Sequence, residues 1–293
     1  WYMFPDAKSH SLGGLCRQFQ VRYDDDEAHR ANYDAEVLNS VWQAMLDKLT
    51  AGNIHLRHAD LDKLTNEKIP LNARVKHAVV FAKNSQGLKD LFKVISYGHI
   101  NCFNGVPRVP RRVLDQYREN FLIGSACFNG EVFETAMTRS KQVLQEKMSY
   151  YDYIEVQPLA NYTFLVNDGQ VSSMDKVQMI VKDIINAADE LGKKVVATSD
   201  CHYVRPYQKQ FRDVYIFAKA VGGVRHPLNP HRRDNMHYEN PDQHLRSTSE
   251  MLEEFAFLGE EKAKEIVIRN SNAIADMIEP LYPVKDKLYP PYI

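Results

Sequence analysis

The sequence predicts an α/β fold built around a parallel sheet. Short apolar segments with the two-residue period of strands alternate with longer segments that repeat apolar residues every three or four positions, as helices do. Repeated strand–helix units place neighbouring strands parallel, because each helix returns the chain to the same end of the sheet. The 293 residues are 44% hydrophobic and 26% charged, which is ordinary globular composition and enough for a substantial core.

Each element has a local pattern. The strands are expected at residues 75–82, 121–126, 152–157 and 194–198, and the helices near 87–97, 131–147, 173–191, 206–221, 248–258 and 260–278. The helix at 173–191 has the strongest pattern, because Ser172 or Ser173 can cap it and Gly192 can end it. The next-to-last helix has a capping-box spacing between Ser247 and Glu250.

The N-terminal part of the chain precedes this alternating series. Two helices are expected there, at residues 9–19 and 34–49, with an acidic loop between them. The stretch from 51 to 72 is polar and contains Pro70, which predicts a linker and a domain boundary. The first residues, Trp1-Tyr2, lack an initiator methionine, so we expect the chain to belong to a longer polypeptide.

Bulk properties exclude several classes of protein. A net charge of -1 gives no global attraction to phosphate backbones, so any nucleic-acid contact must be local. The four cysteines are widely spread, without a C-x-x-C pair, which argues against a disulfide framework. No apolar run approaches the roughly 18 residues that a membrane span needs. We therefore expect a cytoplasmic protein with reduced thiols and no membrane contact.

Potential metal ligands occur at the ends of predicted strands. Asp200 and His202 follow the strand at 194–198 and, two residues apart, point to one side of an extended backbone. Cys127 ends the strand at 121–126, at the same level of the sheet. Parallel α/β sheets bind ligands at these carboxyl ends, and His, Asp and Cys suit Zn or Mn. A helix cap at Asp200 with a surface His202, and a core Cys127, explain the same residues.

His77 lies in the first predicted strand. Alternation places it on the face shared by Val75, Val79 and Phe81, so it is expected to point inward among apolar neighbours. A single inward histidine is commonly a hydrogen-bonded core residue. It becomes a candidate ligand only if other ligands converge on it.

The N-terminal segment offers a second candidate site. His29 stands five residues ahead of Asp34, which opens an amphipathic helix. In a two-metal nuclease such an aspartate binds metal while the histidine deprotonates the attacking water. The alternative is an N-cap aspartate with a histidine in the loop.

Ordered short sequences spread over nearly the whole chain carry a family resemblance. The densest are Val106-Pro-Arg-Val-Pro-Arg, Leu122-Ile-Gly-Ser-Ala-Cys, Gly130-Glu-Val-Phe-Glu, Tyr151-Asp-Tyr-Ile-Glu-Val-Gln-Pro and Val196-Ala-Thr-Ser-Asp-Cys-His-Tyr, and the match continues through Leu245-Arg-Ser-Thr. Together they resemble the PolC-type bacterial DNA polymerase III alpha subunit, in which an exonuclease is inserted into a PHP (polymerase and histidinol phosphatase) domain. The resemblance is specific because of the number and order of these sequences.

The resemblance implies a fold and two metal sites. The fold is a partial PHP-type barrel, a distorted β/α barrel, preceded by the C-terminal helices of an RNase H-like exonuclease domain. The positions that match PHP metal ligands, for Zn or Mn, are His77, Cys127, Asp200 and His202. His29 and Asp34 match the last motif of the DEDDh exonucleases, as catalytic residues and, for Asp34, as a ligand of Mg or Mn.

The same resemblance divides the chain and names its partners. The parts expected are the end of the 3'-5' exonuclease domain, a linker, the C-terminal part of the PHP domain and an extended link toward the polymerase core, at residues 1–54, 55–72, 73–280 and 281–293. The partners implied are DNA, through the parent polymerase, the remaining polymerase domains and the replisome subunits.

Two departures limit the activity expected from these residues alone. The His-x-His motif of the first PHP half is absent, and so are the Asp-x-Glu motif and the middle aspartate of the exonuclease. We therefore expect weak or no metal binding and no nuclease activity, together with self-association through exposed strand edges. The role of Cys201, which stands where the family more often has an aliphatic residue, stays open.

Two other functions fit parts of the sequence. A free-standing PHP-family metal-dependent phosphoesterase would explain the ligands at the strand ends, but it would not explain the segment from His29 to Asp34. Alternatively, the PHP half is a structural scaffold that braces the polymerase core and uses its metals for stability.

Overall fold

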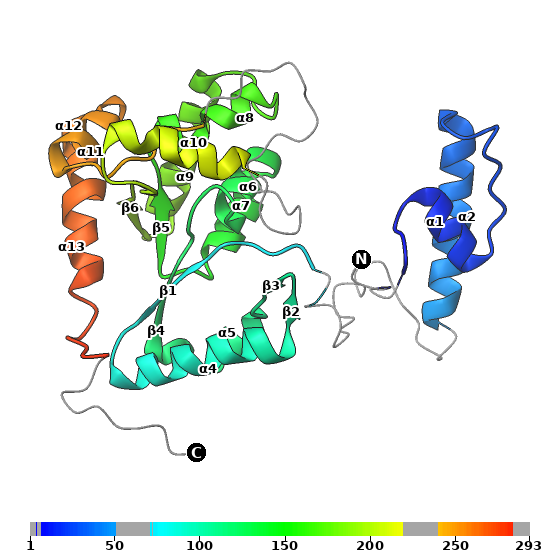
Figure 1. The fold of residues 1–293 in the computed structure, drawn as a ribbon, viewed down its shortest axis with the longest axis horizontal. Coiled ribbons are helices and arrows are strands. Elements are labelled where there is room, and N and C mark those ends of the chain that lie inside the picture. Colours follow the sequence, from blue (N-terminus) through cyan, green and yellow to red (C-terminus); the bar gives the residue numbers. More distant parts are fainter. Residues whose placement is uncertain (1–3, 5–6, 51–70, 72, 219–239, 284–293) are drawn as a thin grey trace. The chain divides into compact units, whose positions relative to one another are not determined.

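The computed structural model describes residues 4, 7–50, 71, 73–218 and 240–283 (Figure 1). It forms two compact units, the first made of Trp1–Val75 and Lys93–Leu114 and the second of Lys76–Phe92 and Asp115–Ile293. All but one residue of the predicted linker lies outside the described part, so the predicted domain limits stay predictions. No described helix is long and apolar enough to cross a membrane.

Two helices form the core of the first unit. α1 spans Leu12–Phe19 and α2 spans Ala31–Thr50, close to the helices predicted at 9–19 and 34–49. The Ser11 hydroxyl caps α1 by accepting a hydrogen bond from the backbone N–H of Gly14 at 3.2 Å. The two helices bury a small apolar cluster formed by Cys16, Val37 and Val41. The unit also holds a short hairpin of β2 (Phe103–Asn104) and β3 (Val106–Pro107), which the sequence analysis did not predict.

A sheet of four strands forms the centre of the second unit. The strands, in the order in which they pair, are β1 (Val79–Ala82), β4 (Phe121–Gly124), β5 (Tyr153–Val156) and β6 (Lys194–Ala197). The strands β4, β5 and β6 are parallel, as predicted, but β1 is antiparallel to β4. The chain between β1 and β4 contains helix α4 (Ser85–Asn101), the hairpin and α5 (Arg111–Asp115) instead of a single crossover helix. Hydrophobic period does not encode the direction of a strand, so this reversal could not be predicted from it.

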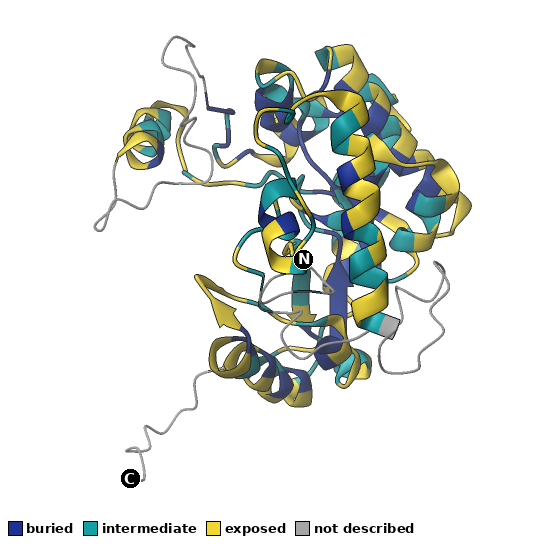
Figure 2. Cartoon of the chain, turned by 90° about the vertical axis from the view of Figure 1, so that its right-hand side faces the viewer, coloured by how far each residue is buried: buried dark blue, intermediate teal, exposed yellow. Residues whose placement is uncertain are grey.

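The three parallel strands are buried on both faces (Figure 2). Leu122, Tyr153 and Val196 pack on one face against Ile274 of helix α13 (Asn270–Ala275). The alternate strand residues are also fully or nearly fully buried: Phe121, Ile123, Ile154 and Val195. Burial on both faces explains why these strands are continuous apolar runs in the sequence.

The second unit also contains the helices α6 (Glu131–Thr138), α7 (Lys141–Met148), α8 (Thr163–Asn167), α9 (Met174–Glu190), α10 (Lys209–Phe217), α11 (Thr248–Glu254) and α12 (Glu260–Lys264). α9 packs against β5 and β6 and confirms the helix predicted at 173–191: Ser173 caps it, and Gly192 follows it with a positive φ of 65°. The capping box between Ser247 and Glu250 is confirmed as well.

Two long helices predicted from the sequence are interrupted in the structure. The predicted helix at 131–147 is divided into α6 and α7, because Arg139 is extended and Ser140 starts the second helix as its N-cap. The predicted helix at 260–278 contains a π-helical turn, η7 (Glu265–Arg269), between α12 and α13. The Ser140 hydroxyl makes no capping hydrogen bond, so the break between α6 and α7 follows from the extended backbone at Arg139 and Ser140.

Candidate functional site

The predicted PHP ligands lie in the second unit and form two pairs. The Sγ atom of Cys127 is 3.3 Å from Nδ1 of His77, and Nε2 of His202 is 3.6 Å from Oδ1 of Asp200. Burial raises the pKa of the Cys127 thiol, and the negative charge of Asp200 raises it further. Cys127 follows β4 and Asp200 follows β6, and the charge of Asp200 acts on the Cys127 thiol.

His77 differs from the prediction in its surroundings. It lies before β1, where its backbone N–H donates to the carbonyl of Asn129 at 3.1 Å, and its side chain is exposed instead of pointing inward. The prediction failed because the ladder between β1 and β4 begins only at Val79. Alternation within a strand therefore does not set the direction of the His77 side chain.

The donor types suit a transition metal, but the described geometry is incomplete. Imidazole, thiolate and carboxylate are ligands of Zn and Mn, and a protein site for such an ion needs three or more of them. Among residues 7–50, 71, 73–218 and 240–283, no group of three or more His, Cys, Asp or Glu side chains is close enough to hold one ion. The described residues therefore suit a metal by their chemistry but are too few to hold one.

Backbone strain coincides with the candidate residues. Non-glycine residues rarely adopt positive φ, and where they do the strain marks candidate functional positions. Three of the described residues that do so are His29 (φ 69°), Ala126 (φ 58°), which precedes Cys127, and Asp200 (φ 48°). The left-handed turn at Asp200 ends the extended chain after β6 and turns it toward His202.

Glu155 of β5 connects the two segments that carry the ligands. Its carboxylate accepts hydrogen bonds from Oγ1 of Thr198 at 3.0 Å and from the backbone N–H of Ala126. Its own backbone N–H donates to Oγ of Ser125 at 2.8 Å. Burial raises the pKa of Glu155 despite these hydrogen bonds. The sequence analysis missed this residue, although a carboxylate within an otherwise apolar strand was the available signal.

The raised pKa of Glu155 predicts a specific dependence of stability on pH. Because the folded state holds this proton more tightly than the unfolded state, its contribution is complete below the unfolded pKa of about 4.5 and is lost as pH rises through the folded pKa. Glu155→Gln cannot ionise, so the unfolding free energy of wild type minus that of the variant should fall as pH rises from 4.5. Urea unfolding at several pH values, with chelator present, measures this difference. A difference that stays constant or increases would contradict the prediction.

The segment that begins at Asn240 holds Asp200 in place. Nε2 of Gln243, which is buried, donates to Oδ2 of Asp200 at 2.9 Å, and the Gln243 carbonyl accepts from the His202 N–H at 2.9 Å. The Tyr203 hydroxyl donates to Oδ1 of Asp242 at 3.0 Å. The exposed thiol of Cys201 donates to the carbonyl of Tyr203 at 3.2 Å, within the same loop. Asp200 is therefore an anchored side chain, which argues against a simple helix cap.

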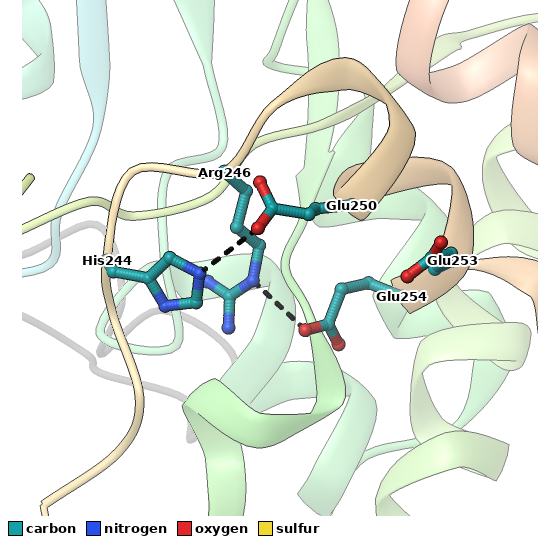
Figure 3. Close-up of a pocket in the computed structure, with 5 residues that line it drawn as sticks. All are labelled: His244, Arg246, Glu250, Glu253 and Glu254. Atoms are coloured by element: carbon teal, nitrogen blue, oxygen red, sulfur yellow. Dashed lines mark hydrogen bonds and ion pairs between the residues drawn. The ribbon is translucent and has the colours of Figure 1, made fainter. Parts of the chain in front are cut away.

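A pocket of about 340 Å³ lies beside this segment, and none of the predicted ligands lines it (Figure 3). It is lined by His244, Arg246, Glu250, Glu253 and Glu254. Nε of Arg246 donates to Oε1 of Glu254 at 3.0 Å, and the Arg246 side chain is only 1% exposed. Nδ1 of His244 lies 3.0 Å from Oδ1 of Asp242. These contacts bind α11 to the segment that holds Asp200, which is a structural role.

The predicted exonuclease residues lie in the first unit. Asp34 is in the first turn of α2, which begins at Ala31, so the alternative of an N-cap aspartate is wrong. Oδ1 of Asp34 is buried, and it has no hydrogen-bond partner within the described part of the chain. His29 is exposed in the loop before α2. The Asp34 carboxylate, with its unsatisfied oxygen, is compatible with a metal ligand. The exposed His29 imidazole is compatible with a base.

Comparisons with known proteins add a family assignment. The family model for the PHP domain matches residues 20–158. A protein named DNA polymerase III PolC-type from Halalkalibacterium halodurans is 41% identical over 292 residues, which covers 100% of this chain and 20% of the relative. The proteins of the same name from Bacillus subtilis and Streptococcus pneumoniae are 39% and 38% identical, over 100% and 99% of this chain and 20% of each relative.

The chain contains a PHP domain, and its mixed α/β fold with a four-stranded sheet is consistent with a partial PHP-type barrel. Along its whole length the chain belongs to the PolC-type DNA polymerase III family. It spans about a fifth of the length of the curated relatives it matches.

Proposed function

We propose that this chain is part of a replicative DNA polymerase that carries out DNA-directed DNA synthesis with 3'-5' proofreading. The observation that carries the proposal is the match of 38–41% identity over essentially the whole chain, which includes both candidate sites. Within the chain we assign His29 and Asp34 to the end of the exonuclease site, and His77, Cys127, Asp200 and His202 to part of the PHP site. DNA and the other parts of the polymerase are the proposed partners.

At the exonuclease site the two residues have different tasks. Bound Mg or Mn would supply a polarised water and stabilise the charge that develops on the phosphate oxygens. Asp34 would hold the metal through its carboxylate, whose Oδ1 has no competing hydrogen bond among the described residues. His29 would accept the proton of the attacking water, because a neutral imidazole is a base near neutral pH.

At the PHP site we propose that Zn or Mn stabilises the fold and does not support turnover. Glu155 ties the strand ends together, and Gln243 holds Asp200, so the candidate ligands belong to a braced structure. The pocket in Figure 3 is lined by none of the candidate ligands. A metal at this place would add one more connection between β4 and β6.

A pair of variants in the full-length polymerase tests this role. Cys127→Ala and His202→Ala should each lower the bound Zn or Mn, measured by elemental analysis, and remove the effect of a chelator on the melting temperature. A metal present at 100 times its dissociation constant stabilises the folded state by about 2.7 kcal/mol. A variant that no longer binds the metal should lose stability of this size. DNA synthesis and exonuclease rates at 25 °C should stay unchanged.

Two outcomes would contradict the proposal. If the variants lose nuclease activity without losing stability, the PHP site is catalytic, as in a free-standing phosphoesterase. If metal content and melting temperature do not change, these residues do not bind the metal. Cys102→Ala provides a control for the loss of a cysteine and should leave the bound metal unchanged. Cys102 is a buried cysteine of the first unit and is not a candidate ligand.

A further inference from the structure

The pocket in Figure 3, which we call the α11 pocket, is lined by His244, Arg246, Glu250, Glu253 and Glu254. Its guanidinium is only partly hydrogen-bonded. Nε of Arg246 donates to Glu254, and Nη2 donates to the carbonyl of Asp242 at 2.9 Å. Nη1 is buried and has no hydrogen-bond partner among the described residues. Because a buried donor without an acceptor is costly, this side of the pocket is suited to an acceptor oxygen of a ligand.

The carboxylates of α11 form the other side of the pocket. Oε2 of Glu250 accepts hydrogen bonds from the backbone N–H and the hydroxyl of Ser247 at 2.7 and 2.8 Å. The Ser247 N–H holds the pKa of Glu250 below its usual range, so this carboxylate stays ionised. Its Oε1 lies 3.9 Å from Nε2 of His244, beyond hydrogen-bonding distance. Glu253 is exposed and forms no hydrogen bond or ion pair within the described part of the chain.

The charges of the pocket indicate the kind of ligand. With His244 neutral, three glutamates and one arginine give the lining residues a net charge of -2. A free anion would meet three carboxylates, and a bare metal ion would meet the guanidinium, so neither is favoured. A ligand that carries both a cation and a carbonyl oxygen satisfies the two sides together. An arginine or lysine residue of a peptide has both groups, and about 340 Å³ is within the range of ligand pockets.

We propose that the α11 pocket binds a basic residue, arginine or lysine, of a partner polypeptide. The side-chain cation of that residue pairs with Glu250 and Glu253, and its backbone carbonyl accepts from Nη1 of Arg246. The bound residue thus supplies the acceptor that Arg246 lacks within the described part of the chain. The inference goes beyond the proposed polymerase function and does not depend on it, because it uses only contacts within this chain.

Titration of the 293-residue chain with N-acetyl-arginine amide, followed by NMR, tests this inference. The probe has a guanidinium and amide carbonyls, and it should shift the backbone resonances of residues 244–254 saturably, with a dissociation constant of about 1 mM for so small a ligand. N-acetyl-citrulline amide has a neutral urea in place of the guanidinium, and ethylguanidinium lacks the carbonyl. Each should bind about threefold more weakly or worse, because each loses one of the two interactions.

Two glutamate variants separate this pocket from the general negative charge of the surface. Glu253→Gln should weaken binding of the arginine probe by about threefold, the usual size of one exposed ion pair. It should leave the melting temperature unchanged, because Glu253 has no hydrogen bond or ion pair among the described residues. Glu279→Gln removes an exposed carboxylate that does not line the pocket, and it should leave the dissociation constant unchanged.

Four results would overturn the inference. If the citrulline probe binds as tightly as the arginine probe, the pocket does not recognise a cation. If inorganic phosphate or a single-stranded oligonucleotide shifts the same resonances and the arginine probe does not, the pocket binds anions. If the shifts rise without saturation, or if Glu253→Gln and Glu279→Gln weaken binding equally, the probe only samples a negative surface. None of these measurements involves DNA synthesis, so they are independent of the proposed function.

Discussion

The His29→Asn variant of the full-length polymerase should lose 3'-5' exonuclease activity by about 10²- to 10⁴-fold, the usual contribution of a general base. Asparagine is the appropriate replacement because His29 has a φ of 69°, a conformation that asparagine tolerates better than most residues do. The backbone before α2 is thereby kept while the proton acceptor is lost. DNA synthesis should be unaffected, so the variant polymerase should copy DNA with an increased error rate.

Two comparisons make this result specific. Asp34→Asn removes the carboxylate charge but keeps its shape, and it should lower exonuclease activity to a similar extent. His99→Ala removes an exposed histidine of α4 that is not part of either site, and it should have no effect. Release of the 3'-terminal nucleotide from a mismatched primer measures the rate. Wild-type rates in both site variants would exclude His29 and Asp34 from the exonuclease.

The second large effect is expected for stability. Glu254→Ala should lower the unfolding free energy of the second unit by about 3 kcal/mol, near the lower end for breaking a buried ion pair. The reason is the partner that remains, because the Arg246 side chain is only 1% exposed, against 29% for Glu254, and its Nε would lose the carboxylate to which it donates, while the charges of Asp242 and Glu250 stay nearby. Nη1 of Arg246 already has no hydrogen-bond partner among the described residues.

A matched pair elsewhere provides the control. Arg269 and Glu261 form an ion pair at 3.3 Å with exposed fractions of 55% and 79%, so Glu261→Ala should cost less than about 1 kcal/mol. Far-UV circular dichroism during urea unfolding is the suitable measurement, because the helices α6 to α13 of the second unit contribute to its signal. Equal losses of unfolding free energy for Glu254→Ala and Glu261→Ala would show that the burial of Arg246 does not raise the cost of removing its partner.

Local patterns predicted the elements whose limits depend on neighbouring residues. Helix α9 has a serine at its N-cap and a glycine after its last turn, and both features act within a few residues of the helix ends. The interruption at Ser140 is equally local, because the backbone is extended at Arg139 and Ser140, but the apolar period continued across it and concealed the boundary. The candidate ligands were also found locally, because their residue types at strand ends are visible without coordinates.

The family and the order of strands and helices were thus encoded in short stretches of residues, where capping, period and motif act over a few positions. The direction of β1, the exposure of His77 and the support of Asp200 by Gln243 were decided only in three dimensions. The physical reason is that each of these depends on a partner far along the chain, such as Gln243, which is 43 positions from Asp200. Periodicity carries no information on which distant backbone or side chain will satisfy a hydrogen bond.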